Sequence, residues 1–343
     1  MRTPYFIAYP NKILENYHIM QSILPVEEVF YSTKPNVENI TFDALAKGNA
    51  SFDIVKLSEM KRLVRLGVAP NKIICSLPIK NSYEIKKMYE LGCRYFVYDC
   101  EQEYKKLIEL APSALKIARI KIDDKENEGI EYGLSKKELI TMTEKGIRPN
   151  GYTFYILNVS SKLDILKKTF ETIEYLLSFH GGEPLVINIG GNYPLPNNAN
   201  DIFYSNLNLL IEGLKKRYSS LKFIAEPGRS IVTNAFDLVT TVLAVKNDNR
   251  VFLDAHSQII KMPPQSIEVK SDNYIRSMER YCFYENLCSH YLLFEGSTEK
   301  KLEVGDRLLL KSCGSYSSCF ANRFHGTGLP YIRVVTNNDR EIK

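Results

Sequence analysis

Short apolar runs alternate with longer amphipathic segments over residues 26–230. The runs are rich in β-branched and aromatic residues, as expected of buried strands, whereas apolar residues between them recur at helical spacing, as Ile85 and Met88 do. Gly67 and Gly92 follow such segments where a helix C-terminal cap is expected. The pattern predicts eight strands, at residues 29–33, 51–55, 72–77, 95–99, 116–122, 152–157, 185–189 and 221–225.

Strands that alternate with helices imply parallel pairing, so the chain is predicted to be of the α/β class. A doubly wound open sheet is compatible with the same alternation. Eight units favour a closed (β/α)8, TIM-like barrel instead.

The rhythm changes after about residue 235, where apolar runs follow one another without long helices between them. These runs predict a β-rich C-terminal domain, which the opening strand at residues 4–9 could join. We therefore expect three parts: a strand at 1–10 that joins the C-terminal domain, a barrel over 11–235, and the β domain over 236–343.

Composition is that of an ordinary soluble protein, with 44% hydrophobic and 25% charged residues in 343. The net charge of +5 comes without a basic cluster, which argues against a nucleic-acid partner. No apolar stretch approaches the roughly 20 residues that span a bilayer, and the N-terminus lacks the apolar core of a signal peptide. We expect a cytoplasmic protein with no membrane partner. Neither the seven cysteines nor the five histidines show metal-ligand spacing, so no metal is predicted.

Chemically capable residues follow the predicted strands at the end where barrels of this kind carry their active sites. A lysine just past a strand is a candidate Schiff-base former, and an acidic residue followed by glycine and arginine could serve a ring nitrogen and a phosphate. Each feature alone is more simply interpreted as a turn or a solvated side chain. Together, at the same end of the predicted barrel, they suggest a pyridoxal phosphate site. The residues concerned are Lys34, Asp53, Arg119, Tyr155, Asn158, Gly190, Gly191, Asn192, Glu226, Gly228 and Arg229.

Several segments, in order, resemble the fold-type III pyridoxal phosphate decarboxylases of the ornithine and diaminopimelate decarboxylase kind. This family has an alanine racemase-like barrel and a C-terminal domain that is a β-barrel or sandwich. The segments that carry the resemblance are 30–36, 51–55 with 58–59, 189–191, 225–229, 305–307, 314–316 and 324–326.

The resemblance implies a role for each matching residue. Lys34 would hold pyridoxal 5'-phosphate as a Schiff base, and Glu226 would keep the pyridine nitrogen protonated. Cys288 would return a proton to the substrate carbon, in the active site of a partner subunit, so a head-to-tail homodimer with shared active sites is implied. Asp53 and Arg119 would line the cofactor site. The phosphate would be bound by Gly190, Gly191, Gly228, Arg229 and Tyr316.

The chain departs from the family's pattern where the substrate would bind. Tyr155 stands where the family has a histidine over the ring, while Asn158 and Asn192 fall within its usually glycine-rich motifs. Ser289 replaces an acidic residue that reads the distal end of the substrate, although Asp254 falls near another substrate aspartate. Either Asp254 alone reads an amine or the substrate is not a simple diamino acid; we favour the second.

These observations predict a decarboxylase of an L-amino acid, free or as part of a carrier- or peptide-linked intermediate in polyamine or specialised biosynthesis. An amino-acid racemase of the same fold is one alternative, but such racemases pair the ring nitrogen with arginine, whereas Glu226 is acidic. A catalytically inactive binding protein like the antizyme inhibitors is another, against which Lys34, Arg229 and Cys288 argue.

Overall fold

The computed structural model describes residues 2–122, 132–178, 185–195, 201–270, 278–287 and 291–335. The chain forms two compact units. The barrel unit comprises Tyr17–Lys34 and Leu45–Ser230, and the β unit comprises Met1–Asn16, Pro35–Ala44 and Ile231–Lys343. The predicted boundaries near residues 10 and 235 stay a prediction.

Eight parallel strands close into a barrel, as the sequence predicts. Closure is made by the first and last of them, because Glu28 pairs with Ile224 and Val29 with Ala225. The open doubly wound sheet is thereby excluded. The strands are β2 (Glu28–Ser32), β3 (Ser51–Ile54), β4 (Ile73–Cys75), β5 (Tyr95–Tyr98), β6 (Leu115–Arg119), β7 (Gly151–Thr153), β8 (Val186–Asn188) and β9 (Lys222–Ala225).

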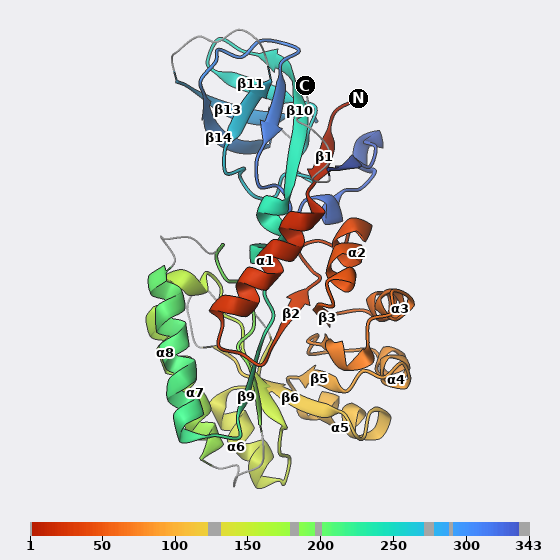
Figure 1. Cartoon of the computed structure of the whole chain (residues 1–343), viewed down its shortest axis with the longest axis vertical. Helices are drawn as coiled ribbons and strands as arrows, with labels where there is room; N and C mark the ends of the chain where they lie inside the picture. Colours follow the sequence, from red (N-terminus) through yellow and green to blue (C-terminus); the bar gives the residue numbers. More distant parts are fainter. Residues whose placement is uncertain are drawn as a thin grey trace. The chain divides into compact units, whose positions relative to one another are not determined.

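Helices of the barrel unit lie outside these strands (Figure 1). Helix α4 (Ser82–Glu90) is an example of how the sequence forms such a helix. At its start the Asn81 side chain accepts a hydrogen bond from Tyr83 N, and its apolar residues Ile85 and Met88 are buried. Gly92, at φ 100°, follows its end as predicted. No helix in the described ranges is long and apolar enough to cross a membrane. The other helices of the barrel unit are α3 (Leu57–Arg65), α5 (Glu101–Leu110), α6 (Lys136–Glu144), α7 (Leu163–Leu177) and α8 (Asp201–Arg217). The unit boundaries fall within α1 (Pro10–Ile23), α2 (Asn39–Lys47) and α9 (Arg229–Val232).

An apolar layer fills the barrel interior, formed by Phe30, Ile74, Tyr95, Val97, Ile117 and Ile224 with Val186 packed against them. Side chains along a strand alternate between its two faces, so the residue two positions further on again points inward. Six polar residues occupy that next level, at or just past the C-terminal ends of strands: Ser32, Ser76, Asp99, Arg119, Asn188 and Glu226. The same alternation that builds the core therefore builds a polar mouth above it.

The β unit contains a mixed eight-stranded sheet, which confirms the predicted β-rich domain. Its central path runs β12-β15-β10-β11-β13-β14, and β1 pairs antiparallel with β10 and parallel with β16. The strands are β1 (Tyr5–Ala8), β10 (Phe236–Val245), β11 (Arg250–Leu253), β12 (Ile267–Lys270), β13 (Glu279–Glu285), β14 (Leu292–Thr298), β15 (Arg307–Leu310) and β16 (Tyr331–Val334).

A buried ion pair ties the loop after β4 to helix α5. Lys80 Nζ lies 2.9 Å from Glu103 Oε1, and the two side chains are 0% and 1% exposed. The same ammonium donates to the carbonyl oxygens of Leu77, Pro78 and Val97. Because water cannot reach this ammonium, its charge depends on these partners.

We expect Glu103→Gln to lower the free energy of unfolding by about 3 kcal/mol, because it leaves the Lys80 charge buried without its counter-ion. Urea titration of the full chain measures the change. Glu90→Gln is the matched control: its pair with Lys87 is exposed, so stability should hardly change. Equal losses in the two variants would contradict the role given to burial.

Candidate active site

Glu226, the residue that follows β9, carries a carboxyl group held largely out of water. Its Oε1 accepts a hydrogen bond from Asn188 Nδ2 at 2.5 Å. Burial raises the pKa of Glu226 to about 8, and the negative charge of Asp53 adds to the rise. The Asn188 hydrogen bond and the positive charges of Lys34 and Arg119 oppose it. The carboxyl therefore holds a proton readily near neutral pH.

A second buried carboxyl, on Asp53 at the end of β3, shares this mouth. Its Oδ2 accepts from Ser32 Oγ at 3.0 Å and its Oδ1 from Ser76 N at 3.3 Å. Burial raises the pKa of Asp53, and the charge of Lys34 is the largest opposing influence. The positive charge of Lys34 thus acts on both the Asp53 and the Glu226 carboxyls.

The backbone that presents Lys34 is fixed by the residue before it. Thr33 donates through its hydroxyl to Glu59 Oε1 at 2.6 Å and through its N–H to the Asp53 carbonyl at 3.1 Å. Glu59 Oε2 in turn accepts from the backbone N–H groups of Val55 and Lys56, at 2.9 Å each. Lys34 is itself exposed, on a turn that neighbouring strands hold in place.

Two glycines after β8 let backbone segments approach more closely than any side chain would permit. A Cβ on Gly190, at φ 66°, would lie 2.4 Å from the Phe154 carbonyl oxygen, and one on Gly191 would lie 2.2 Å from that of Glu226. The next loop supplies Gly228, which is buried, and Arg229, whose Nη2 lies 3.5 Å from the carbonyl oxygen of Asn192. Glycines and an arginine at adjacent strand ends are the donors that suit a phosphate.

Arg119, at the end of β6, faces two aromatic rings. Its guanidinium carbon lies 5.9 Å from the Tyr155 ring centre and 5.6 Å from that of Tyr132. Burial lowers the pKa of Arg119, and the Glu226 carboxylate is the first influence that opposes the change. Asn158 follows in a left-handed conformation at φ 52°. Tyr155 lies past the end of β7, which is shorter than the predicted strand because pairing stops at Thr153.

Two predicted site residues belong to the β unit. Tyr316 adopts φ 55° and donates its N–H to the Pro35 carbonyl oxygen at 2.8 Å. Asp254 is fully engaged: its oxygens accept from the Thr3 hydroxyl at 2.5 Å, the Thr240 hydroxyl at 2.6 Å and the Thr241 N–H at 2.9 Å.

The remaining two predicted site residues, Cys288 and Ser289, lie outside the described residues. Two further residues of the barrel mouth were not singled out from the sequence, Asn188 and Tyr95. Asn188 also donates to Tyr95 Oη at 2.9 Å, and both are buried. Their inward positions on β8 and β5 were the available signal, because a polar residue at an inward position of a barrel strand needs a partner.

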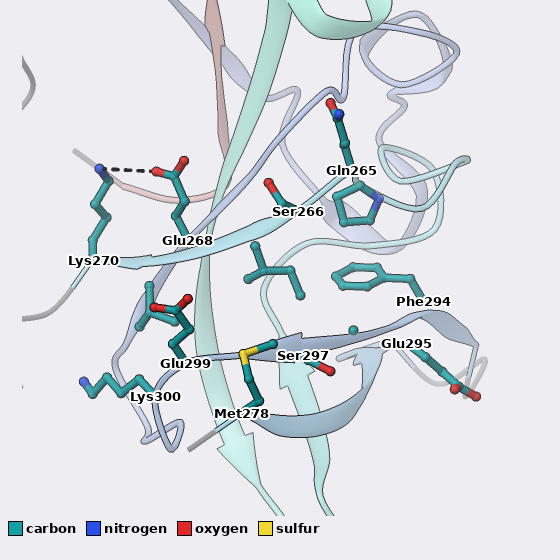
Figure 2. A pocket seen from close by; sticks show the side chains of 14 residues that line it. Gln265, Ser266, Glu268, Lys270, Met278, Phe294, Glu295, Ser297, Glu299 and Lys300 are labelled. Carbon is teal, nitrogen blue, oxygen red and sulfur yellow. Dashed lines mark ion pairs between the residues drawn. The ribbon is translucent and has the colours of Figure 1, made fainter. Parts of the chain in front are cut away.

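A groove in the β unit is a competing candidate, with a volume of about 960 Å³ between β12 and β14 (Figure 2). Most of its charged groups are solvated: Glu268 and Lys270 lie 3.8 Å apart with about half of each side chain exposed. The buried Lys300 is paired with Asp306 at 3.1 Å. Glu295 and Glu299 are also exposed. Exposed pairs of this kind have ordinary surface chemistry, so the barrel mouth is the better site. Within the described ranges, no cluster of His, Cys, Asp and Glu could hold a metal ion.

The residues at the barrel mouth have the chemical groups that binding of pyridoxal phosphate requires. Among the described residues, Glu226 Oε2 has no hydrogen-bond partner, so it can serve a ring nitrogen. Gly190 and Gly191 allow the loop after β8 to pack directly against the backbone at Phe154 and Glu226, next to the loop that carries Gly228 and Arg229. The side chain of Lys34 carries the kind of amine that a Schiff base requires.

Comparisons with known proteins agree with this fit. Residues 10–139 match the family described as pyridoxal-dependent decarboxylase, pyridoxal binding domain. The lysine/ornithine decarboxylase of Selenomonas ruminantium is 25% identical over 94% of this chain and 87% of its own. Antizyme inhibitor 2 of Xenopus laevis is 25% identical, over 71% of this chain and 57% of its own.

The whole fold has solved counterparts. The arginine decarboxylase of Paramecium bursaria Chlorella virus, in a crystal structure with agmatine, superimposes with a TM-score of 0.83 at 19% identity, over 98% of both chains. The family match over residues 10–139 and the relatives make this chain similar to the pyridoxal phosphate-dependent decarboxylases, and the solved structures show that it has the same fold.

Proposed function

We propose that this chain is a pyridoxal phosphate-dependent α-decarboxylase of an L-amino acid, or of an amino-acid group on a larger biosynthetic intermediate. The observation that carries the proposal is the Glu226 carboxyl, which accepts from Asn188, has a raised pKa and is acted on by the positive charge of Lys34. An acid at the ring nitrogen keeps the ring protonated, which loss of CO2 requires and which an arginine in that place would not provide. Glu226 therefore favours decarboxylation over racemisation.

Each residue of the mouth has a part in this proposal. When bound, pyridoxal phosphate supplies the electron sink that accepts the electron pair of the breaking C–CO2 bond. Lys34 would hold it covalently, Glu226 would hold a proton at the ring nitrogen, and Asp53 and Arg119 would line the site. Tyr155 would take the place of the family's histidine over the ring. The phosphate would be held by Gly190, Gly191, Gly228, Arg229 and Tyr316, with Asn158 and Asn192 in the adjoining loops.

The proton that replaces CO2 on the substrate carbon is assigned to Cys288. We propose that this cysteine reaches the site from the partner subunit of a head-to-tail homodimer. Cys288→Ala should then slow formation of the amine product, or give products in which the proton is not delivered correctly to the substrate carbon.

The substrate end of the site supports a substrate other than a simple diamino acid. Ser289 cannot offer a carboxylate to a distal ammonium. Asp254 has both carboxylate oxygens engaged by Thr3, Thr240 and Thr241. A group held by three donors has a structural role, and a neutral or carrier-linked amino acid would need no carboxylate from Asp254.

The second candidate is a catalytically inactive regulator, which the similarity to antizyme inhibitor 2 supports. We expect Lys34→Ala to abolish both the visible absorption band of the lysine-bound cofactor and CO2 release from a panel of L-amino acids. Lys167→Ala, an exposed lysine on α7, is the control and should keep both. A wild-type chain that shows no cofactor band would favour the regulator, whereas inversion without CO2 release would favour a racemase.

Asp254→Asn should lower the free energy of unfolding by about 2 kcal/mol, because hydrogen bonds to a charged group are lost. We expect the ratio of kcat/KM for L-ornithine to kcat/KM for a neutral L-amino acid to stay constant. Asp248→Asn, at an exposed position of the same unit, is the control. A tenfold or greater selective loss with ornithine would show that Asp254 reads the substrate.

The raised pKa of Glu226 makes stability depend on pH. The folded chain holds this proton up to about pH 8, whereas the unfolded chain releases it near the ordinary value of 4.5. Between pH 4.5 and about pH 8 the folded state binds more protons than the unfolded state, so the contribution of Glu226 to stability falls as the pH rises. Above about pH 8 this contribution no longer changes with pH. The cofactor-free Glu226→Gln variant should therefore gain stability relative to wild type across this window, as thermal unfolding at several pH values would measure. A difference that does not vary with pH would contradict the raised pKa.

A further inference from the structure

The orientation of the Asn188 side chain is determined by its hydrogen-bond partners. Its Oδ1 accepts from Gly190 N at 2.9 Å. A backbone N–H can only donate, so the amide oxygen must face Gly190 and the NH2 group must face the opposite side. There it donates to Tyr95 Oη at 2.9 Å and to Glu226 Oε1 at 2.5 Å. Asn188 is 0% exposed, so no water competes for these bonds.

This orientation makes the two oxygens of Glu226 unequal. The amide NH2 can only donate, so Oε1 must accept with a lone pair, and a proton on the carboxyl belongs on Oε2. Oε2 has no hydrogen-bond partner among the described residues. It is therefore both the proton-bearing oxygen and the one available to a ligand.

We propose that Asn188 is a positioning residue for the reaction, which fixes Oε2 of Glu226 as the oxygen that faces the cofactor ring nitrogen and keeps the shared proton on that nitrogen. This inference rests on the proposed function, in which Glu226 serves the ring nitrogen. By donating to Oε1, Asn188 lowers the basicity of the carboxylate, so the proton lies on the ring. Without that donation the carboxylate would retain the proton on Oε2.

Charged and titratable groups around Glu226 do not make Asn188 redundant. Lys34 and Arg119 favour its charged form, and Asp53 disfavours it. The phenols of Tyr95 and Tyr193 stay neutral, because burial raises the pKa of both well above its usual range. Asn188 makes the only direct hydrogen bond to the Glu226 carboxyl among the described residues.

The proposal is tested on the holoenzyme reconstituted with pyridoxal phosphate labelled with 15N in the ring. The nitrogen chemical shift separates the protonated from the neutral ring. We expect the wild type to show the protonated form at neutral pH. In Asn188→Leu the ratio of protonated to neutral ring should fall about tenfold to a hundredfold, the effect of losing one hydrogen bond to a charged group. Asn150→Leu, which removes another asparagine of the barrel unit, should keep the wild-type shift.

Glu226→Gln separates this inference from the proposed function. If Glu226→Gln leaves the ring protonated, the role of Glu226 in the proposed function fails. If Glu226→Gln removes the ring proton and Asn188→Leu does not, the role of Asn188 alone fails. In the Glu226→Gln background, the Asn188→Leu change should have no further effect on the shift.

Asn188→Ser, a smaller polar replacement, provides a second test if the Asn188→Leu variant does not fold or does not bind the cofactor. In the cofactor-free full chain, carboxyl 13C titration should then show a Glu226 pKa higher than in wild type, because the charged form loses a donor. An unchanged Glu226 pKa in a folded Asn188→Ser chain would overturn the proposal.

Discussion

Closure of eight short parallel strands into a barrel is the constraint on which the rest of the site depends. A closed barrel has an interior packed with side chains, and the alternation along each strand repeats every two residues. The residue above the apolar layer on β9 is therefore inward and poorly hydrated whatever its chemistry. Placing carboxyl groups there, on Glu226 and Asp53, raises the pKa of each. The proton-holding capacity of the site thus follows from strand geometry before any ligand is considered.

Much of this arrangement could be predicted from the sequence, because strands and their ends are local features. All eight barrel strands were predicted, and Lys34, Asp53 and Glu226 lie in one barrel, where their charges act on one another. The hydrogen bonds of Asn188 could not be predicted. They depend on the register among β5, β8 and β9, which brings residues 95, 188 and 226 together although they are far apart in the chain. The predicted end of β7 was wrong for a related reason, since periodicity continues past Thr153 whereas pairing does not.

The residues at the cofactor end of the proposed site indicate which cofactor binds, whereas the residues at the substrate end do not indicate which substrate binds. Lys34, the glycine pair and Glu226 have the chemistry that the cofactor demands. Asp254 shows how a residue in a plausible sequence position can be committed elsewhere, because three donors engage it within the β unit. The substrate is therefore determined by side chains other than those that bind the cofactor.

The pairing of β1 with β16 has a consequence for how the chain is made. Tyr5 and Tyr331 are neighbours in this parallel ladder, so the sheet joins two strands that are more than 320 residues apart, the first and the last within the described ranges. All barrel strands, by contrast, lie between Glu28 and Ala225 and can pair before the ribosome releases the chain. During synthesis, β1 must wait with an unpaired edge until residues 331–334 emerge. The opening segment is thus the part of the nascent protein most exposed to wrong pairing, although it ends up inside a sheet.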